Sequence, residues 1–160
     1  MADMFLERCL VPLSQGKDAD TEGLEKMPPE LALIRTTNRK GQRWLQRGSP
    51  LVLEEWQTDA DAFHGCSLTW LTPGDGELDI DTDHIIDDFD AWADREIVTG
   101  RVVDQTACAA PIFDYFRVLQ FTSDKPPYVR FFMYSTTSGE GTDGVGMSVA
   151  ETITPGNGDC

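Results

Sequence analysis

The chain has 160 residues, of which 40% are hydrophobic, so it is long enough to bury a core and too apolar to stay disordered. Its 28 acidic residues against 13 basic ones give a formal net charge of -15, which makes direct binding to nucleic acids or anionic membranes a poor prediction. The same charge excess would also serve solubility or adaptation to high salt, without any specific partner.

The N-terminal part is predicted to be peripheral. A short helix is expected over residues 1 to 11, and a polar loop then runs to Pro29, so that residues 1 to 29 precede the main body of the domain. The first residues lack the basic start and long apolar core of a signal peptide, and no stretch reaches the eighteen apolar residues of a membrane span. We therefore expect a cytoplasmic location and no membrane partner.

The four cysteines are far apart in the sequence and form no Cys-x-x-Cys pair, so we expect free thiols rather than disulfides. They are Cys9, Cys66, Cys108 and Cys160. His64 and Cys66 are close enough to supply two zinc ligands, but a structural zinc site needs four ligands and a catalytic site needs three. A zinc site is therefore not predicted.

Short β-branched and aromatic stretches predict strands on both sides of a single helix. Two pairs of these stretches are expected to form hairpins, the first turning at Asn-Arg-Lys-Gly and the second at Thr-Ser-Asp-Lys-Pro-Pro. The predicted strand regions, in chain order, are residues 31–37, 42–47, 49–56, 66–72, 96–103, 115–121, 128–135 and 147–154. A polar tail is expected over residues 155–160.

The one convincing helix is predicted from residue 82 to residue 95. Ile85, Phe89 and Trp92 recur there at helical spacing, so we expect them to pack on the apolar face of the sheet. The predicted fold is a single α+β domain over residues 1 to 160. It consists of an antiparallel sheet of about five to seven strands, with one main amphipathic helix packed on one face.

A calcium site is one interpretation of the acidic segment around the start of this helix. Asp79, Asp81, Asp83 and Asp90 occupy positions 1, 3, 5 and 12 of a calcium-binding loop. The sixth position, normally glycine, is His84, and no helix is expected before the loop. The alternative is that Asp81 and Asp83 cap the helix and complement its positive end. Calcium is the one cofactor that the sequence raises.

The segment from Asp75 to Glu96 contains ten carboxylates and a single arginine. The aspartates that lie off the apolar stripe are predicted to form an acidic face, which binds a basic partner surface by complementary charge. They are Asp87, Asp88, Asp90 and Asp94. Because rows of carboxylates can imitate phosphates, one version of this hypothesis is an inhibitor that mimics a nucleic acid.

The first predicted hairpin carries five of the thirteen basic residues, with no acidic residue between them. One interpretation is that the hairpin packs near the acidic helix and neutralises it within the fold. The other is that Arg39, Lys40, Arg43 and Trp44 dock to an acidic or phosphate-bearing partner. The sequence leaves both open.

Two further motifs are not taken as functional. Gly-Glu-Gly-Thr-Asp-Gly, at residues 139–144, has the letters of a dinucleotide-binding loop but is followed by strand-like sequence instead of a helix. Ser148 lies in a near match to a nucleophile elbow, which requires a following helix and a later histidine.

The leading prediction is a non-enzymatic, acidic protein-interaction module. Calcium binding over Asp79 to Asp90 and a small enzyme with a carboxylate-lined pocket are the alternatives.

Overall fold

The computed structural model describes residues 1–28, 33–36, 39–58, 63–70, 81–108, 114–136 and 144–153. Its helical elements are α1 (Ala2–Phe5), the π-helix η1 (Leu6–Leu10), α2 (Val11–Ser14), α4 (Thr82–Val98) and the 3-10 helix η2 (Thr106–Cys108). Its strands are β1 (Glu25–Lys26), β2 (Leu33–Thr36), β3 (Arg39–Leu45), β4 (Leu51–Thr58), β5 (His64–Trp70), β6 (Val102–Asp104), β7 (Tyr115–Phe121), β8 (Tyr128–Thr136) and β9 (Gly144–Thr152).

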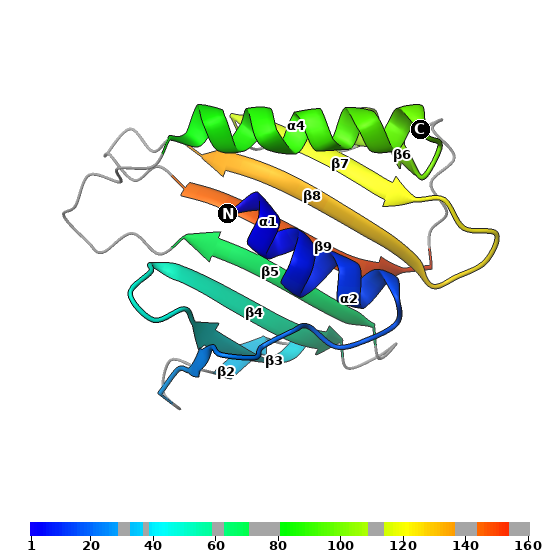
Figure 1. Cartoon of the computed structure of the whole chain (residues 1–160). Coiled ribbons are helices and arrows are strands. Elements are labelled where there is room, and N and C mark those ends of the chain that lie inside the picture. The colour runs from blue at the N-terminus through cyan, green and yellow to red at the C-terminus, as the bar shows by residue number, and fades with distance from the viewer. Residues whose placement is uncertain are drawn as a thin grey trace.

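The described strands form one antiparallel sheet of nine strands, with both main helical segments on the same face (Figure 1). The strand order is β1-β3-β4-β5-β9-β8-β7-β6, and β2 also pairs with β3. The α+β class and the antiparallel sheet are thus confirmed, whereas the predicted five to seven strands fall short. Strand β1 had no predicted counterpart, and the predicted strand over residues 96–103 is wrong in its first part, which is the end of α4, and overlaps β6 only at its last two residues.

The sheet is built from two halves with the same topology. Each half is a helical segment followed by an antiparallel meander, and the halves meet where β5 pairs with β9. In the first half the edge position is shared by β1 and β2, which pair with different parts of β3. The sequence shows no internal repeat, so this resemblance between the halves lies in topology alone.

The N-terminal helical segment belongs to the core, although the sequence placed residues 1 to 29 at the periphery. Phe5, Leu10 and Leu13 are almost completely buried beneath the segment, against β5 and β9. Pro12 interrupts the helical hydrogen bonds because it has no N–H to donate to the carbonyl of Arg8. The backbone N–H of Asp20 satisfies that carbonyl instead, at 2.8 Å, which folds the following loop back along the helix.

A disulfide joins Cys9 of the helical segment to Cys66 of β5, so the prediction of four free thiols is wrong for this pair. Their Cα atoms are 5.4 Å apart, within the usual range for a disulfide, and both residues are fully buried. The two positions are 57 residues apart in the sequence, and only the fold brings them together. Since Cys66 is bonded to Cys9, it is not available as a zinc ligand.

The predicted long helix is confirmed as α4 and extends three residues beyond its predicted end. The Asp81 side chain caps it by accepting a hydrogen bond from the backbone N–H of His84. Gly100, at a φ of 72°, ends it with a backbone hydrogen bond to Ile97. Phe89 is buried, and Trp92 packs with it against Phe131 of β8, with ring centroids 5.4 to 6.5 Å from that phenylalanine.

Both predicted hairpins are present, with different accuracy. The β7–β8 hairpin has the predicted strands. The β2–β3 hairpin pairs Thr36 with Arg39, so its turn comes earlier than the predicted Asn-Arg-Lys-Gly. In β7, the alternation places Tyr115 and Arg117 on the face that carries the helices, so a charged side chain lies on that face.

On the opposite face, two aromatic rings lie over glycines of the central strands. Trp56 of β4 covers Gly65 of β5, and Tyr134 of β8 covers Gly146 of β9. A Cβ atom on either glycine would overlap the ring, so these strands tolerate glycine because a neighbouring aromatic side chain occupies the space. The two halves of the sheet therefore use the same device at their shared centre.

Candidate functional site

Four aspartates form an acidic stripe along α4: Asp83, Asp87, Asp90 and Asp94. Their spacings of four, three and four residues keep them within about 60° of one another around the helix axis, over a length of about 16 Å. Asp83 and Asp87 are exposed, and their side chains have no hydrogen-bond or ion-pair partner within the described residues. This stripe runs along the side of α4 that faces strands β6 and β7.

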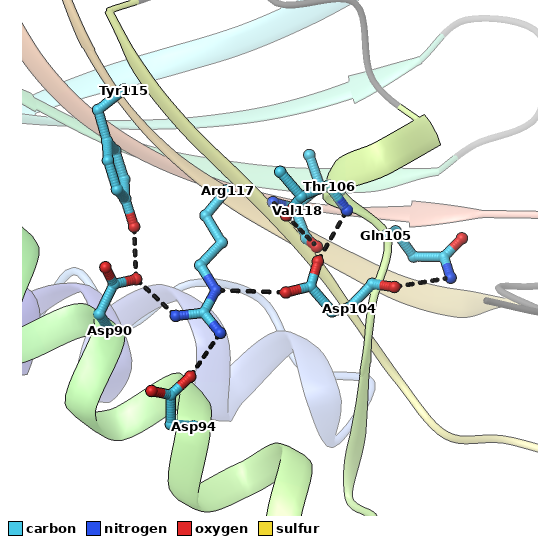
Figure 2. Close-up of polar contacts among 8 residues, drawn as sticks. All are labelled: Asp90, Asp94, Asp104, Gln105, Thr106, Tyr115, Arg117 and Val118. Atoms are coloured by element: carbon cyan, nitrogen blue, oxygen red, sulfur yellow. Dashed lines mark hydrogen bonds and ion pairs between the residues drawn. The ribbon is translucent and has the colours of Figure 1, made fainter.

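Arg117 of β7 lies against the C-terminal half of the acidic stripe (Figure 2). It donates to Asp90 Oδ1 from one terminal nitrogen and to Asp94 Oδ1 from the other, both at 2.6 Å. Its Nε lies 3.5 Å from Asp104 Oδ2 of β6. The Arg117 side chain is only 15% exposed, so one guanidinium links the helix to the edge of the sheet.

Tyr115 completes this cluster by donating its hydroxyl hydrogen to Asp90 Oδ1 at 2.5 Å. Burial and, after it, the hydrogen bond to the Asp90 carboxylate raise the pKa of Tyr115 above its ordinary value. Burial lowers the pKa of the Arg117 guanidinium, but the hydrogen bonds to Asp90 and Asp94 outweigh it and raise that pKa. Both residues therefore keep their protons when the cluster forms.

Among the described residues of this cluster and the acidic stripe, the charges do not cancel. The acidic stripe and Asp104 together contribute five carboxylates, whereas Arg117 contributes one positive charge. Of the aspartates predicted to bind a partner, Asp87 is exposed and Asp90 and Asp94 already contact Arg117. Asp88 lies on the other side of α4, where its Oδ2 is 3.5 Å from His84 Nε2.

The basic residues of the first hairpin lie far from this stripe. Five strand spacings separate β3 from β7 in the sheet, or about 24 Å, so the hairpin does not neutralise α4. Arg43 instead pairs with Glu54 of β4, and Arg47 pairs with Glu25 at 2.7 Å. Trp44 packs against the core, which leaves Lys40 as the exposed member of the predicted docking set. The side chain of Arg39 lies outside the described residues.

The proposed calcium ligands are not gathered around one point. Asp81 caps α4, and Asp90 lies about 13 Å further along the helix axis, in contact with Arg117. Asp79 lies outside the described residues, as does most of the Gly-Glu-Gly-Thr-Asp-Gly segment. Within the part of the chain that is described, no three histidine, cysteine or acidic side chains are arranged to hold a metal ion.

A second site is an open cleft of about 410 Å³ on the helix-bearing face of β3, β4 and β5, beyond the end of α2. At this end of the three strands, polar side chains replace the apolar ones on the helix-bearing face. Gln42 lies opposite Glu55 there. One step further along the same face, Lys40, Gln57 and His64 lie side by side on the three strands. The loop after α2 closes one side of this cleft. No local pattern in the sequence indicates this cleft, because its lining residues come from four separate segments.

Polar contacts hold the acidic part of the cleft in place. His64 Nδ1 is 3.4 Å from Asp18 Oδ1, and the backbone N–H of Ala19 donates to Glu55 Oε1 at 2.9 Å. The backbone N–H of His64 donates to Glu151 Oε2 at 3.0 Å. Two carboxylates thus lie beside a histidine in one cleft, an arrangement capable of proton transfer to or from a small ligand, whereas the Trp56 ring lies on the opposite face of the sheet.

Ser148 offers no support for a hydrolase. It lies in the middle of β9, and its hydroxyl oxygen is 2.8 Å from that of Ser67 on the neighbouring strand.

Within the described residues no helix has the length and apolar character needed to cross a membrane.

Comparison of the chain with models of known protein families, with curated proteins and with solved structures gives no match. A function therefore has to be inferred from the geometry and charge of the sites themselves.

Proposed function

We propose that this protein is a binding module that holds a basic surface of another protein against the acidic stripe of α4. The observation that supports it is the excess of charge: Asp83 and Asp87 have no partner among the described residues, and one arginine faces the remaining stripe carboxylates. An acidic surface on a rigid helix attracts and orients a basic partner through complementary potential. Arg117 fixes the helix, so the stripe is held ready before the partner arrives.

A protein surface fits this stripe better than mimicry of a nucleic acid does. The described stripe is about 16 Å long, which is about half of one turn of duplex DNA at 34 Å. It also stands on one side of a single helix, whereas a duplex presents two strands of phosphates. A row of four carboxylates of this length matches a basic helix or loop on a partner.

The test is affinity capture from a cell extract at low salt, followed by elution in a salt gradient. Asp83→Asn with Asp87→Asn removes the two stripe charges that have no partner among the described residues, and we expect about tenfold weaker retention of the captured basic protein. The matched control is Glu22→Gln with Asp124→Asn, which removes the same net charge elsewhere on the exposed surface. If both double variants lose the partner equally, or if retention does not depend on salt, the stripe is not the binding site.

The cleft of β3, β4 and β5 supports a second candidate, a small enzyme or small-ligand site. Here the supporting observation is that Asp18, Glu55 and His64 line one cleft. Asp18 would orient His64 through Nδ1, leaving Nε2 to act as a general base toward a bound water or a ligand hydroxyl. A screen of small ester and amide substrates tests this candidate. Turnover that His64→Gln abolishes would support it, and turnover unchanged in that variant would remove it.

A further inference from the structure

A groove of about 360 Å³ lies between the N-terminal helical segment and α4. Its floor is apolar, formed by Leu6 of η1 and Trp92 of α4, and the Trp92 ring also contacts Phe131, with ring centroids 5.4 Å apart. Asp3 stands on one wall, and Asp88 stands on the opposite wall. The groove is therefore a narrow aromatic-floored space with a carboxylate on each side.

The charges at the rim favour a cation. Arg95 lies at the rim as well, so the two carboxylates exceed the resident positive charge by one. The groove also borders the solvent-facing side of α4, whose opposite flank carries the acidic stripe, and the whole chain has a formal net charge of -15. An anionic or neutral segment approaching this helix would gain nothing from that field, whereas a basic segment would be drawn to it.

Arginine fits the groove better than lysine does. The aliphatic part of an arginine side chain can lie on Leu6, and its flat guanidinium can stack on the part of the Trp92 ring that lines the groove. Its planar fork offers hydrogen-bond donors in two directions, toward Asp3 and toward Asp88. A lysine ammonium is more strongly hydrated and presents a point charge that does not stack in this way.

We propose that the groove between the N-terminal helical segment and α4 binds an arginine side chain of the basic partner, with the guanidinium on Trp92 between Asp3 and Asp88. This proposal rests on the proposed function, because it names the side chain through which the same partner docks beside the acidic stripe. The groove supplies specificity for arginine, and the stripe supplies the longer-range attraction.

The probe is a ten-residue peptide with four arginines separated by glycine and serine, compared with the same peptide carrying lysines. Binding is measured by calorimetry at low salt and by the shift of the Trp92 indole N–H signal in NMR spectra, assigned with Trp92→Phe.

Two variants act on the groove: Asp3→Asn with Asp88→Asn removes its carboxylates, and Ala91→Met fills it from an exposed helical position. Val98→Met, at another exposed position of α4, controls for added apolar surface.

We expect the arginine peptide to shift the Trp92 signal and to bind about fivefold more tightly than the lysine peptide. Each groove variant should weaken arginine binding by about fivefold, while Val98→Met and the Glu22→Gln, Asp124→Asn control leave it unchanged. In one contrary outcome, both peptides bind equally, the Trp92 signal does not move, and the binding is lost in the Asp83→Asn, Asp87→Asn variant. That result would overturn the proposal for the groove and leave the proposal for the acidic stripe in place. Absence of binding by either peptide would overturn both.

Discussion

The two halves of the sheet share a topology but attach their helices by different means. In the first half, a buried disulfide joins the helical segment to β5, and apolar side chains fill the contact. In the second half, aromatic rings and the Arg117 cluster join α4 to β7 and β8. Because the first attachment is a covalent bond, it does not depend on any charged residue at the surface of the N-terminal helical segment. The second attachment uses two of the acidic stripe's own carboxylates, so stability and surface charge are coupled on α4.

The largest difference between the halves should appear on removing the disulfide. In the chain-entropy model, a bridge across 57 residues stabilises the fold by about 4 kcal/mol. We expect the Cys9→Ala, Cys66→Ala variant to lose about that much free energy of unfolding, measured by urea denaturation. The matched control, Cys108→Ser with Cys160→Ser, should keep its sensitivity to a reducing agent.

If a reducing agent leaves the urea midpoint of the wild-type protein unchanged, the first half is held by packing alone. The contrast between the two attachments would then disappear. Mass analysis of alkylated peptides gives an independent check, since Cys9 and Cys66 should resist alkylation until the protein is reduced.

A smaller effect is expected from the attachment of the second half. Arg117→Met keeps the apolar part of the side chain but leaves Asp90, Asp94 and Asp104 without their shared cation. We expect a loss of about 2 kcal/mol in the free energy of unfolding, because several charge-assisted hydrogen bonds disappear together. The loss should shrink at high salt, where screening reduces repulsion between the remaining carboxylates.

The matched control is Arg47→Met. Arg47 pairs with Glu25 at 2.7 Å, and their side chains are 85% and 54% exposed, so we expect a loss of under about 1 kcal/mol. Equal losses in the two arginine variants would mean that Arg117 is an ordinary surface pair, and the coupling between attachment and acidic stripe would not hold.

Local patterns in the sequence were enough to predict the helix and the β7–β8 hairpin, because each depends on residues close together in the chain. Ile85, Phe89 and Trp92 give a helical period that packing reinforces. The disulfide, the arginine cluster and the cleft could not be predicted in this way. Cys9 meets Cys66, and Arg117 meets Asp90, only after a helix has packed on a strand that is distant from it in the sequence.

The first hairpin illustrates the same limit in charge. The count of basic residues in this hairpin was accurate, but the acidic residues that they face depend on the order of the strands in the sheet. Arg43 lies opposite Glu54 because β3 pairs with β4, and α4 lies at the other end of the sheet. A count of charges along the chain gives no information on which acidic residues each arginine will face.

The smallest expected effect separates the hydrogen bond of Tyr115 from the rest of the second attachment. Tyr115→Phe removes the hydroxyl that donates to Asp90, and near neutral pH we expect a loss of about 1 kcal/mol in the free energy of unfolding. The raised pKa means that the folded state keeps this proton after the unfolded state has lost it, so wild-type stability should fall above about pH 10. Phenylalanine has no such proton, and Tyr128→Phe, at the start of β8, is the control that leaves Asp90 and its hydrogen bonds in place. Urea denaturation at pH 7 and near pH 11 should therefore show the wild type and Tyr115→Phe converging at the higher pH. A constant difference between them would mean that Asp90 does not hold this proton in the folded state.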